Sequence, residues 1–256
     1  MANQGGGILT LSMSDTQSKE NLEYWENRYK KRNFEWHIEE VHPQLLKYLS
    51  KLTQLETEET VEGSKAKKFF VPLCGKTKDI PFLLKLGFEV FAVEAIDSVV
   101  QELINENNLE LTFDEKRSIY HDKDEQLKIY CGDLFKCPIE EYGPFDCIWD
   151  RASFIALDYS FRPSYIDMMK RSVGYGSENG VHNFRYLLQS VTYDKSNFAG
   201  PPRCVDAADI KEFFGLWADV TVLESNWVSL DHPCRRVNGY YEDDFFEEFH
   251  FFQPKN

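Results

Sequence analysis

Strand-like and helix-like segments alternate through most of this chain, and that alternation constrains the fold more than any other feature. Apolar strand patterns occupy residues 67–73, 88–95, 127–135, 145–150 and 182–194. Helical patterns occupy residues 78–87, 97–108, 162–174 and 206–215. Strands separated by helices of this length predict a mostly parallel sheet covered by helices on both faces. The sequence therefore predicts one α/β domain.

Two segments depart from the alternation. Strand patterns at 219–228 and 244–252 follow one another without a helix between them, which predicts an antiparallel pair at one edge of the sheet. The polar stretch 109–126 is interpreted as an excursion from the sheet in the form of a hairpin.

The N-terminal part of the chain is helical in pattern. Amphipathic helices are predicted at 18–31 and 39–52, and the charged stretch 53–68 is interpreted as a surface connection. Residues 1–18 contain a glycine triplet and no basic start followed by an apolar run, so they predict a flexible tail and not a secretion signal.

Composition narrows the class of function. The chain has 256 residues, 42% of them hydrophobic, and no apolar run reaches the length of about 18 that a membrane span needs. Its formal charge of −14 disfavours a nucleic-acid partner. No two of the six cysteines have C-x-x-C spacing, so no metal site is predicted, and cysteines within apolar runs are typical of reduced thiols in a cytoplasmic protein.

The loop after the first strand of the sheet, "FVPLCGKTKDI", lies where open α/β sheets bind ligands. A dinucleotide loop places three glycines against a pyrophosphate, but only Gly75 is present here. One glycine still allows the backbone to approach a ligand closely, which suits a nucleoside without phosphates. An ordinary strand-to-helix turn is the alternative interpretation.

Polar residues end three further strands. Glu94 ends the second strand, 19 positions after Gly75, close to the offset of about 20 at which an acid binds ribose hydroxyls. Asp133 follows the third strand, and Asp150 with Arg151 ends the fourth. Each alone could be a surface charge. Together they predict a pocket for a ribosylated adenine that lacks phosphate.

These strings resemble a known family. "FVPLCGKTKDI", "VFAVEAI", "CGDLF", "FDCIWDRASFIAL" and "SVTYDKSNFAGPPRCV" are similar to thiopurine S-methyltransferases, and "YWENRYKKRNFEWH" resembles the lid of that family. The resemblance implies a single Rossmann-like class I methyltransferase domain over residues 19–256, with lid helices at 19–52 and the α/β core at 68–256. It also implies S-adenosylmethionine as the cofactor.

The resemblance implies roles for individual residues. Arg151 would lie between cofactor and substrate, with Asp150 orienting it or acting as a base. Arg235 and Arg236 are candidates for the substrate loop, although that segment aligns poorly. The remaining cofactor-binding residues implied are Trp25, Tyr29, Trp36, Leu73, Gly75, Glu94, Asp133 and Leu134.

The activity implied is methyl transfer to the sulfur of a thiopurine or another small thiol. The alternatives are a methyltransferase for thiocyanate or halide acceptors, an NAD-dependent oxidoreductase, and a binding domain without turnover. The expected partner is a small-molecule thiol, with no nucleic acid and no membrane. We expect a cytoplasmic monomer.

Overall fold

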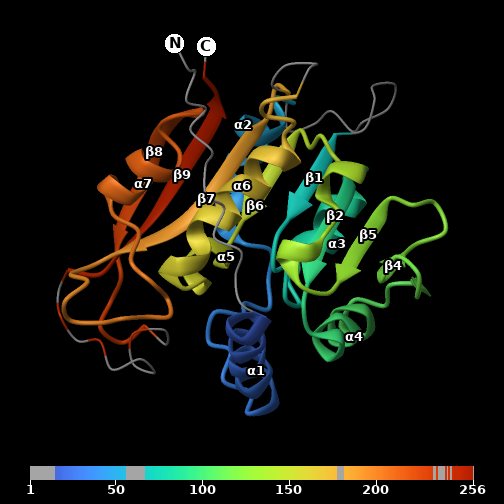
Figure 1. Ribbon diagram of the computed structural model, residues 1–256, viewed down its shortest axis with the longest axis horizontal. Coiled ribbons are helices and arrows are strands. Elements are labelled where there is room, and N and C mark those ends of the chain that lie inside the picture. The colour runs from blue at the N-terminus through green and yellow to red at the C-terminus, as the bar shows by residue number, and fades with distance from the viewer. Residues whose placement is uncertain are drawn as a thin grey trace, which may run out of the picture.

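The computed structural model of the chain describes residues 15–55, 67–177, 182–232, 235, 240, 242 and 244–255. Its described residues form one nine-stranded sheet in the order β3-β4-β5-β2-β1-β6-β7-β9-β8 (Figure 1). The strands are β1 Lys68–Val71, β2 Glu89–Glu94, β3 Thr112–Asp114, β4 Ile119–His121, β5 Leu127–Cys131, β6 Cys147–Asp150, β7 Arg185–Thr192, β8 Ala218–Trp227 and β9 Phe246–Pro254.

Helices cover both faces of this sheet, as the sequence predicts. The helices are α1 Asp15–Lys30, α2 Pro43–Thr53, α3 Asp79–Lys85, α4 Asp97–Glu106, α5 Ser153–Ala156, α6 Arg162–Ser172 and α7 Ala207–Phe213. Alternate residues of β1 enter different cores: Phe69 and Val71 pack with α2, α3 and α4, whereas Phe70 packs with α5, α6 and α7. Because strand side chains alternate between faces, apolar residues at every position bury both sides. The predicted three-layer α/β fold is confirmed.

The strand order reverses beside β1. From β1 the chain proceeds to β2 and then β5, which pair in parallel on one side of it. It then crosses back to β6 and β7, which pair in parallel on the other side. The loops at the carboxyl ends of β1 and β6 therefore run in opposite directions and leave a crevice between them. Ligands bind in such a crevice in open sheets of this kind.

Antiparallel strands close both edges. The two final strands pair antiparallel, and β9 also pairs antiparallel with β7, so the last strand lies between β7 and β8. At the other edge β3, β4 and β5 form an antiparallel ladder, so the predicted hairpin at 109–126 is confirmed. Strand β5, predicted at 127–135, is shorter than predicted. It ends at Cys131, and residues 134–136 form the 3-10 turn η1 (Leu134–Lys136).

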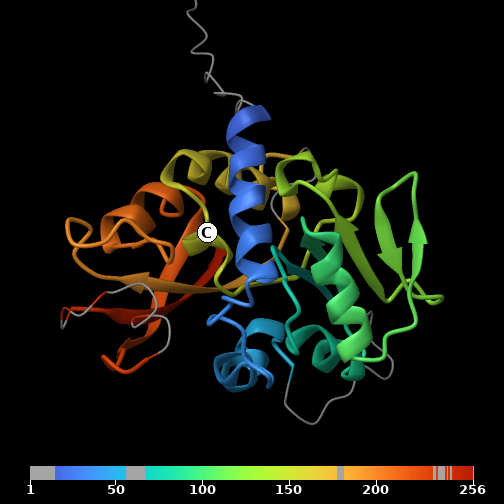
Figure 2. The ribbon, with the colours of Figure 1, turned by 90° about the horizontal axis from the view of Figure 1, so that it is seen from below.

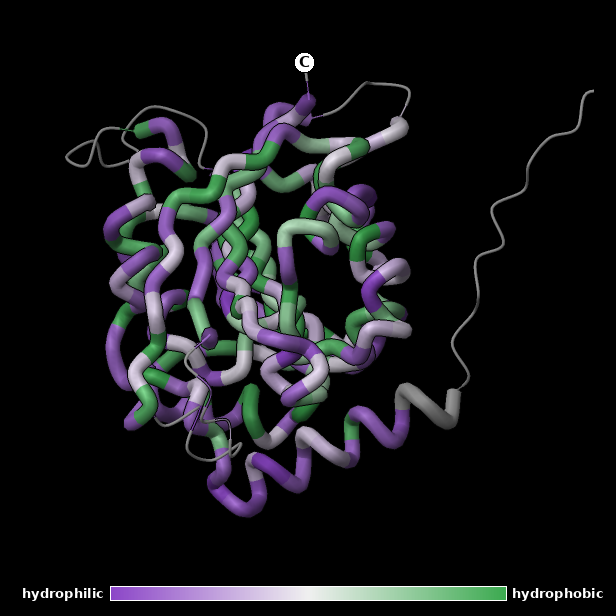
Figure 3. Tube along the Cα trace, turned by 90° about the vertical axis from the view of Figure 1, so that its left-hand side faces the viewer, coloured by the Kyte–Doolittle hydropathy of each residue, from purple (hydrophilic) through white to green (hydrophobic). Residues whose placement is uncertain are grey.

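Helix α1 crosses the end of the sheet where the parallel strands finish (Figures 1 and 2). Figure 3 shows it as a rod along one side of the molecule, mostly hydrophilic in colour. It begins at Asp15, so residues 15–18 are helical and the predicted tail is too long there. Residues 1–14, most of the 53–68 connection and Arg236 lie outside the described residues. No helix within the described ranges combines the length and the apolar character needed to cross a membrane.

Candidate active site

A cavity of about 1140 Å³ lies between α1 and the carboxyl ends of the parallel strands. Its lining comes from α1, the segment 35–44, the ends of β1, β2 and β6, the loops that follow β1, β2, β5 and β6, two residues of β7, one residue of β9, and the loop residues Pro201, Pro202 and His232. The structure brings all nine predicted cofactor-binding residues to this one cavity. They are Trp25, Tyr29, Trp36, Leu73, Gly75, Glu94, Asp133, Leu134 and Arg151. Residues that end four different strands therefore share one pocket.

The loop after β1 is held from two sides. Cys74 N–H donates to the Val93 carbonyl over 2.8 Å, and the Ser153 hydroxyl donates to the Pro72 carbonyl over 2.6 Å. Gly75 has φ +54, a conformation that side chains rarely adopt, and a Cβ there would lie 2.8 Å from Tyr29 Oη. The glycine lets the loop and the lid approach each other closely.

Substitution of Gly75 by Ala is expected to weaken cofactor binding by displacing Tyr29 as well as straining the loop. Gly176→Ala is the matched control, because Gly176 has φ +80 but nothing within 4 Å of the added Cβ. Calorimetric titration with S-adenosylhomocysteine should show a loss of affinity, roughly 10-fold or less, in Gly75→Ala alone, and Tyr29→Phe in the same chain should restore part of it. Equal affinities in the two alanine variants would contradict the steric role of Tyr29.

Glu94 is buried at the end of β2, only 6% exposed. One carboxylate oxygen accepts from Ile96 N–H and the other from Gly75 N–H, both over 3.0 Å. Burial raises the pKa of the Glu94 carboxyl, and these backbone donors oppose the rise. Because a carboxylate has about four acceptor positions, each oxygen retains capacity for a further donor. The group fits a ribose diol.

The neighbouring strand end supplies Asp133. Gly132 N–H donates to the Glu94 carbonyl over 3.0 Å, which places Asp133 beside the end of β2. One Asp133 oxygen caps η1 by accepting from Phe135 N–H over 3.0 Å, and Leu134 is buried beside it. A partly exposed carboxylate next to an apolar side chain fits the edge and face of an adenine. S-adenosylmethionine therefore fits the residues present at this end of the cavity.

Aromatic rings form the lid. The Trp36 ring lies edge-on to Trp25 and Tyr29, with centroids 5.3 and 5.8 Å away. Arg28 lies over the Trp36 ring at 5.0 Å and pairs with Glu35 over 3.0 Å. Burial raises the pKa of the Tyr29 hydroxyl, so Tyr29 is neutral at physiological pH. These contacts join α1 to the segment after it and cover the cavity.

Arg151 follows β6 and enters the cavity between the lid and the sheet. Its guanidinium donates through Nη2 to the Trp36 carbonyl, while its buried Nε has no hydrogen-bond partner among the described residues. Burial lowers the pKa of Arg151, and the charges of Asp79 and Glu247 oppose that shift. A partly buried cation that lines a cavity is suited to an anionic ligand.

Asp150 faces away from this cavity, and its predicted role there is corrected. Its carboxylate is fully buried and accepts from the hydroxyls of Tyr165 and Tyr186 over 2.7 and 2.6 Å. It also accepts from Ser153 and Phe154 N–H, at the start of α5. Adjacent residues of a strand point to opposite faces of a sheet, so Arg151 reaches the site while Asp150 enters the core. Asp150 contacts neither Arg151 nor the cavity and holds α5 and α6 in place.

Arg235 is also corrected as a substrate residue. Its side chain is fully buried and donates to the carbonyls of Val228, Tyr240 and Glu242. It therefore closes the connection between β8 and β9 and does not line the cavity. Arg236, the other candidate, is not among the described residues.

Sequence reasoning missed the buried carboxylate beneath the lid. Asp79, only 1% exposed, accepts from His42 N–H over 2.8 Å and from Trp149 Nε1–H over 2.7 Å. It thereby ties the start of α3 to the segment before α2 and to β6. An acid at a helix start is a common cap, so the sequence offered no signal that distinguished it.

His42 caps α2 in its neutral form, because its Nδ1 accepts from Gln44 N–H over 3.2 Å. Burial, followed by the charge of Arg151, lowers the pKa of His42 to about 4, against about 6.5 when unfolded. The stability that neutral His42 contributes is complete above pH 6.5 and is lost as the pH falls toward 4.

We expect His42→Asn, which keeps a capping acceptor, to gain stability relative to the parent chain across that range, by at most about 1.4 kcal/mol per pH unit. Denaturant unfolding of both chains at pH 7.5, 5.5 and 4.5 measures this gain in the free energy of unfolding. A gain that does not change with pH would contradict the lowered pKa of His42.

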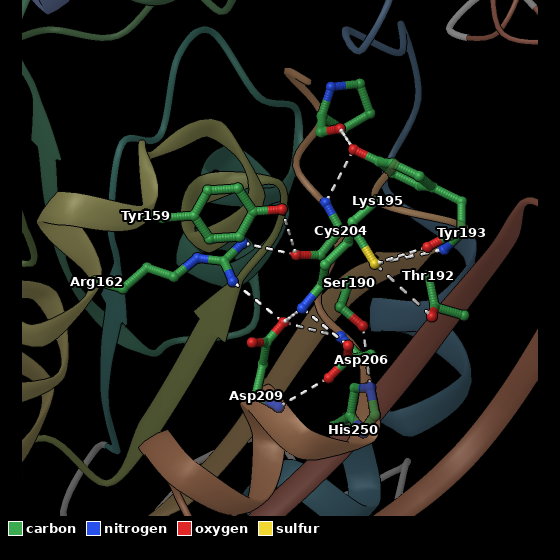
Figure 4. A network of polar contacts seen from close by, with 11 residues as sticks. Tyr159, Arg162, Ser190, Thr192, Tyr193, Lys195, Cys204, Asp206, Asp209 and His250 are labelled. Carbon is green, nitrogen blue, oxygen red and sulfur yellow. Dashed lines mark hydrogen bonds and ion pairs between the residues drawn. The ribbon is translucent and has the colours of Figure 1, made fainter. Parts of the chain in front are cut away.

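A polar network surrounds the segment that follows β7 (Figure 4), and Pro201 and Pro202 of that segment line the cavity. The Tyr193 hydroxyl donates to the Pro202 carbonyl over 2.6 Å and accepts from Cys204 N–H over 2.9 Å. Arg162, fully buried, donates to the Cys204 carbonyl over 2.8 Å and pairs with Asp209 at 3.4 Å. The network holds in place the loop that contains Pro201 and Pro202, which line the cavity.

Comparison with known proteins decides the family. A model of the family described as "Thiopurine S-methyltransferase (TPMT)" matches residues 20–246. The chain belongs to the thiopurine S-methyltransferase family. Similar proteins include the thiopurine S-methyltransferase of Bos taurus, 29% identical with 91% of this chain and 90% of that protein covered. The enzyme of the same name from Vibrio atlanticus is 32% identical, with 83% of this chain and 89% of that protein covered.

Solved structures support the fold of this methyltransferase. A Burkholderia thailandensis 1,6-didemethyltoxoflavin-N1-methyltransferase with bound S-adenosylhomocysteine matches with TM-score 0.55 and 11% identity, covering 97% of this chain and 94% of that one. The N-terminal domain of EvdMO1 with S-adenosylhomocysteine bound matches with TM-score 0.52 and 8% identity, covering 83% and 80%. The predicted family, fold and enzyme class are confirmed. Family membership contradicts the alternative of an NAD-dependent oxidoreductase.

Proposed function

We propose that this enzyme methylates the sulfur of a thiopurine or of another small thiol. The cofactor is S-adenosylmethionine, which supplies a methyl group carried on a positively charged sulfur. The observation that carries the acceptor assignment is the partly buried guanidinium of Arg151, which lines the cavity and whose Nε–H has no partner among the described residues. The names of the curated relatives, thiopurine S-methyltransferases, support the same acceptor.

Arg151 binds the acceptor in its thiolate form, which is the stronger nucleophile. A guanidinium remains charged and does not accept a proton, so it favours the thiolate electrostatically and the thiol proton leaves to solvent. The displacement needs the two reacting atoms about 3 to 3.5 Å apart and in line, so the residues that hold both molecules supply most of the catalysis. Glu94 and Asp133 fix the adenosine end, while Arg151 fixes the acceptor.

The lid excludes water from the reacting atoms. Trp25, Tyr29 and Trp36 form a continuous aromatic surface over the cavity, and rings of this kind attract a cationic sulfur. Removal of water strengthens the interaction of Arg151 with a thiolate, because the local dielectric falls.

Transfer of a radiolabelled methyl group to a panel of acceptors tests this function. The panel comprises 6-mercaptopurine, thiophenol, 2-mercaptoethanol, thiocyanate and iodide. The proposal is supported if kcat/KM is higher for the thiols than for thiocyanate and iodide. A preference for thiocyanate or iodide would replace it with the halide-type activity, and binding of S-adenosylhomocysteine without methylation of any acceptor would show a binding domain.

We further propose that the enzyme acts as a cytoplasmic monomer on small molecules, without a nucleic-acid partner. The net charge of −14 disfavours nucleic acid, and the five cysteines among the described residues are free thiols, as in a reducing compartment. Among the described residues no cluster of His, Cys, Asp and Glu side chains suits a metal ion.

A further inference from the structure

Lys76, in the loop after β1, is a buried cation that no step of the proposed reaction uses. It lines the cavity beside Gly75, and only 3% of its surface is exposed. A lysine is almost never buried to this extent unless it is paired. Its ammonium donates to Glu106 over 2.5 Å and pairs with Glu102 at 3.2 Å. These glutamates are four positions apart on α4, so one face of that helix anchors the ammonium.

The Lys76 side chain is charged in this position. Burial alone would lower its pKa, but the hydrogen bonds and charges of Glu106 and Glu102 outweigh burial and raise the pKa. Both glutamates are partly exposed to water, whereas the ammonium is enclosed. A desolvated cation attracts the face of an aromatic ring more strongly than an exposed cation does. The side chain is therefore a fixed positive charge suited to holding a ring.

Adjacent residues of this loop contact neighbouring rings of the lid. The Lys76 ammonium lies 5.0 Å from the centroid of the Phe34 ring, in the segment that follows α1. Gly75 lies against Tyr29, because a Cβ at Gly75 would be 2.8 Å from Tyr29 Oη. Phe34 and Tyr29 contact each other, with centroids 5.6 Å apart and planes tilted by 32°. The cofactor loop and the lid therefore meet along two consecutive residues.

The charged contacts of Arg28 join α1 to the segment that follows it. Arg28 donates to the Asn33 carbonyl over 2.7 Å and to Glu35 over 3.0 Å. Contacts of this kind give the lid its shape but do not attach it to the sheet. Lys76 supplies an attachment from the body of the enzyme, because its partners fix it to α4.

We propose that Lys76 is a positioning residue that retains the cofactor by holding the lid closed. Anchored by Glu102 and Glu106, its ammonium keeps the Phe34 ring, and through it Tyr29, against the cofactor loop. Tyr29 lines the cavity, so its movement away from the loop opens a path by which the ligand leaves. Lys76 acts through Phe34 and not on the ligand. The inference concerns cofactor retention and does not depend on the identity of the methyl acceptor.

The rate at which S-adenosylhomocysteine leaves the enzyme tests this role. Radiolabelled ligand is bound to each variant and chased with excess unlabelled ligand, so the measured rate reports folded, occupied molecules alone. We expect Lys76→Met to raise the dissociation rate about 2- to 30-fold, the range that a cation–π contact supplies. Lys78→Met is the matched control, because Lys78 bonds to Asn107 at the end of the same helix over 3.1 Å and does not line the cavity. Its dissociation rate should equal that of the parent chain.

A double-variant cycle shows whether Lys76 acts through the ring. Phe34→Leu keeps an apolar side chain without a ring and should also speed dissociation. When Lys76→Met is added to Phe34→Leu, the rate should rise no further, because the contact is already lost. Effects of the two substitutions that multiply would show that Lys76 acts on the ligand directly, and this result would overturn the proposal.

A conservative variant separates the charge from the fold. Lys76→Arg keeps a cation that stacks on rings, so it should release the ligand more slowly than Lys76→Met. Equal rates in these two variants would contradict the attraction between the charge and Phe34. A role in folding alone predicts a lower free energy of unfolding for Lys76→Met with the dissociation rate of the parent chain, and that result would also overturn the proposal.

Discussion

Replacement of Arg151 by Met is expected to lower kcat/KM for a thiol acceptor roughly 10- to 150-fold, equivalent to about 1.5–3 kcal/mol. Met keeps much of the apolar stem but removes the charge of a residue that lines the cavity, together with its Nε–H, which has no partner among the described residues. The loss should appear in the methyl-transfer step, measured in single-turnover experiments with saturating S-adenosylmethionine. It should be largest below the pKa of the free thiol, where the parent enzyme must favour the thiolate.

Two control variants separate the effect of the Arg151 charge from the effect of contacts within the lid. Arg151→Lys keeps a positive charge without the planar set of donors, so an intermediate rate is expected. Arg28→Met removes the other guanidinium that contacts Trp36 and should weaken S-adenosylhomocysteine binding more than the methyl-transfer step. A normal single-turnover rate in Arg151→Met, in a chain that still binds S-adenosylhomocysteine, would refute the contact between Arg151 and the acceptor.

Replacement of Glu94 by Ala should weaken S-adenosylhomocysteine binding by about 1.5–3 kcal/mol, roughly 10- to 150-fold in Kd. The side chain supplies acceptors for a ribose diol and also holds Gly75 N–H over 3.0 Å, so its removal affects both the ligand and the loop. Calorimetric titration measures the affinity directly.

Glu89→Ala is the matched control, because Glu89 begins the strand that Glu94 ends and lies outside the cavity. Thermal unfolding of both variants without ligand shows whether the chain remains folded. Equal affinity in Glu94→Ala and the parent chain would remove Glu94 from the cofactor site.

Much of the fold followed from the sequence because its signals are local. Apolar runs of strand length alternate with amphipathic helices, and each such segment can bury its apolar face only in a layered sheet. The positions of Gly75, Glu94 and Asp133 were predictable for a related reason. Glu94 ends a parallel strand and the other two follow one, and the carboxyl ends of parallel strands meet at one edge of the sheet.

The sequence could not separate Asp150 from Arg151. They are adjacent in the chain: Asp150 ends the strand pattern at 145–150, and Arg151 follows it. Only the pleat of the sheet in its final register directs Asp150 to the hydroxyls of Tyr165 and Tyr186 and Arg151 to the cavity. Arg235 was misjudged because a loop arginine is as suited to a ligand as to the backbone carbonyls that it contacts here.

By itself, the sequence determined the layered α/β fold, the family and the edge of the sheet where the cofactor residues gather, since local periodicity and motif spacing carry that information. Tertiary structure alone decided which residues of β7 and β9 line the cavity. Gln189 lies on β7 and Glu247 on β9, and the two residues are 58 positions apart in the chain. They meet only because the last strand inserts between β7 and β8. A contact that depends on strand order has no local signal, because neither residue's neighbours in the chain predict its partner.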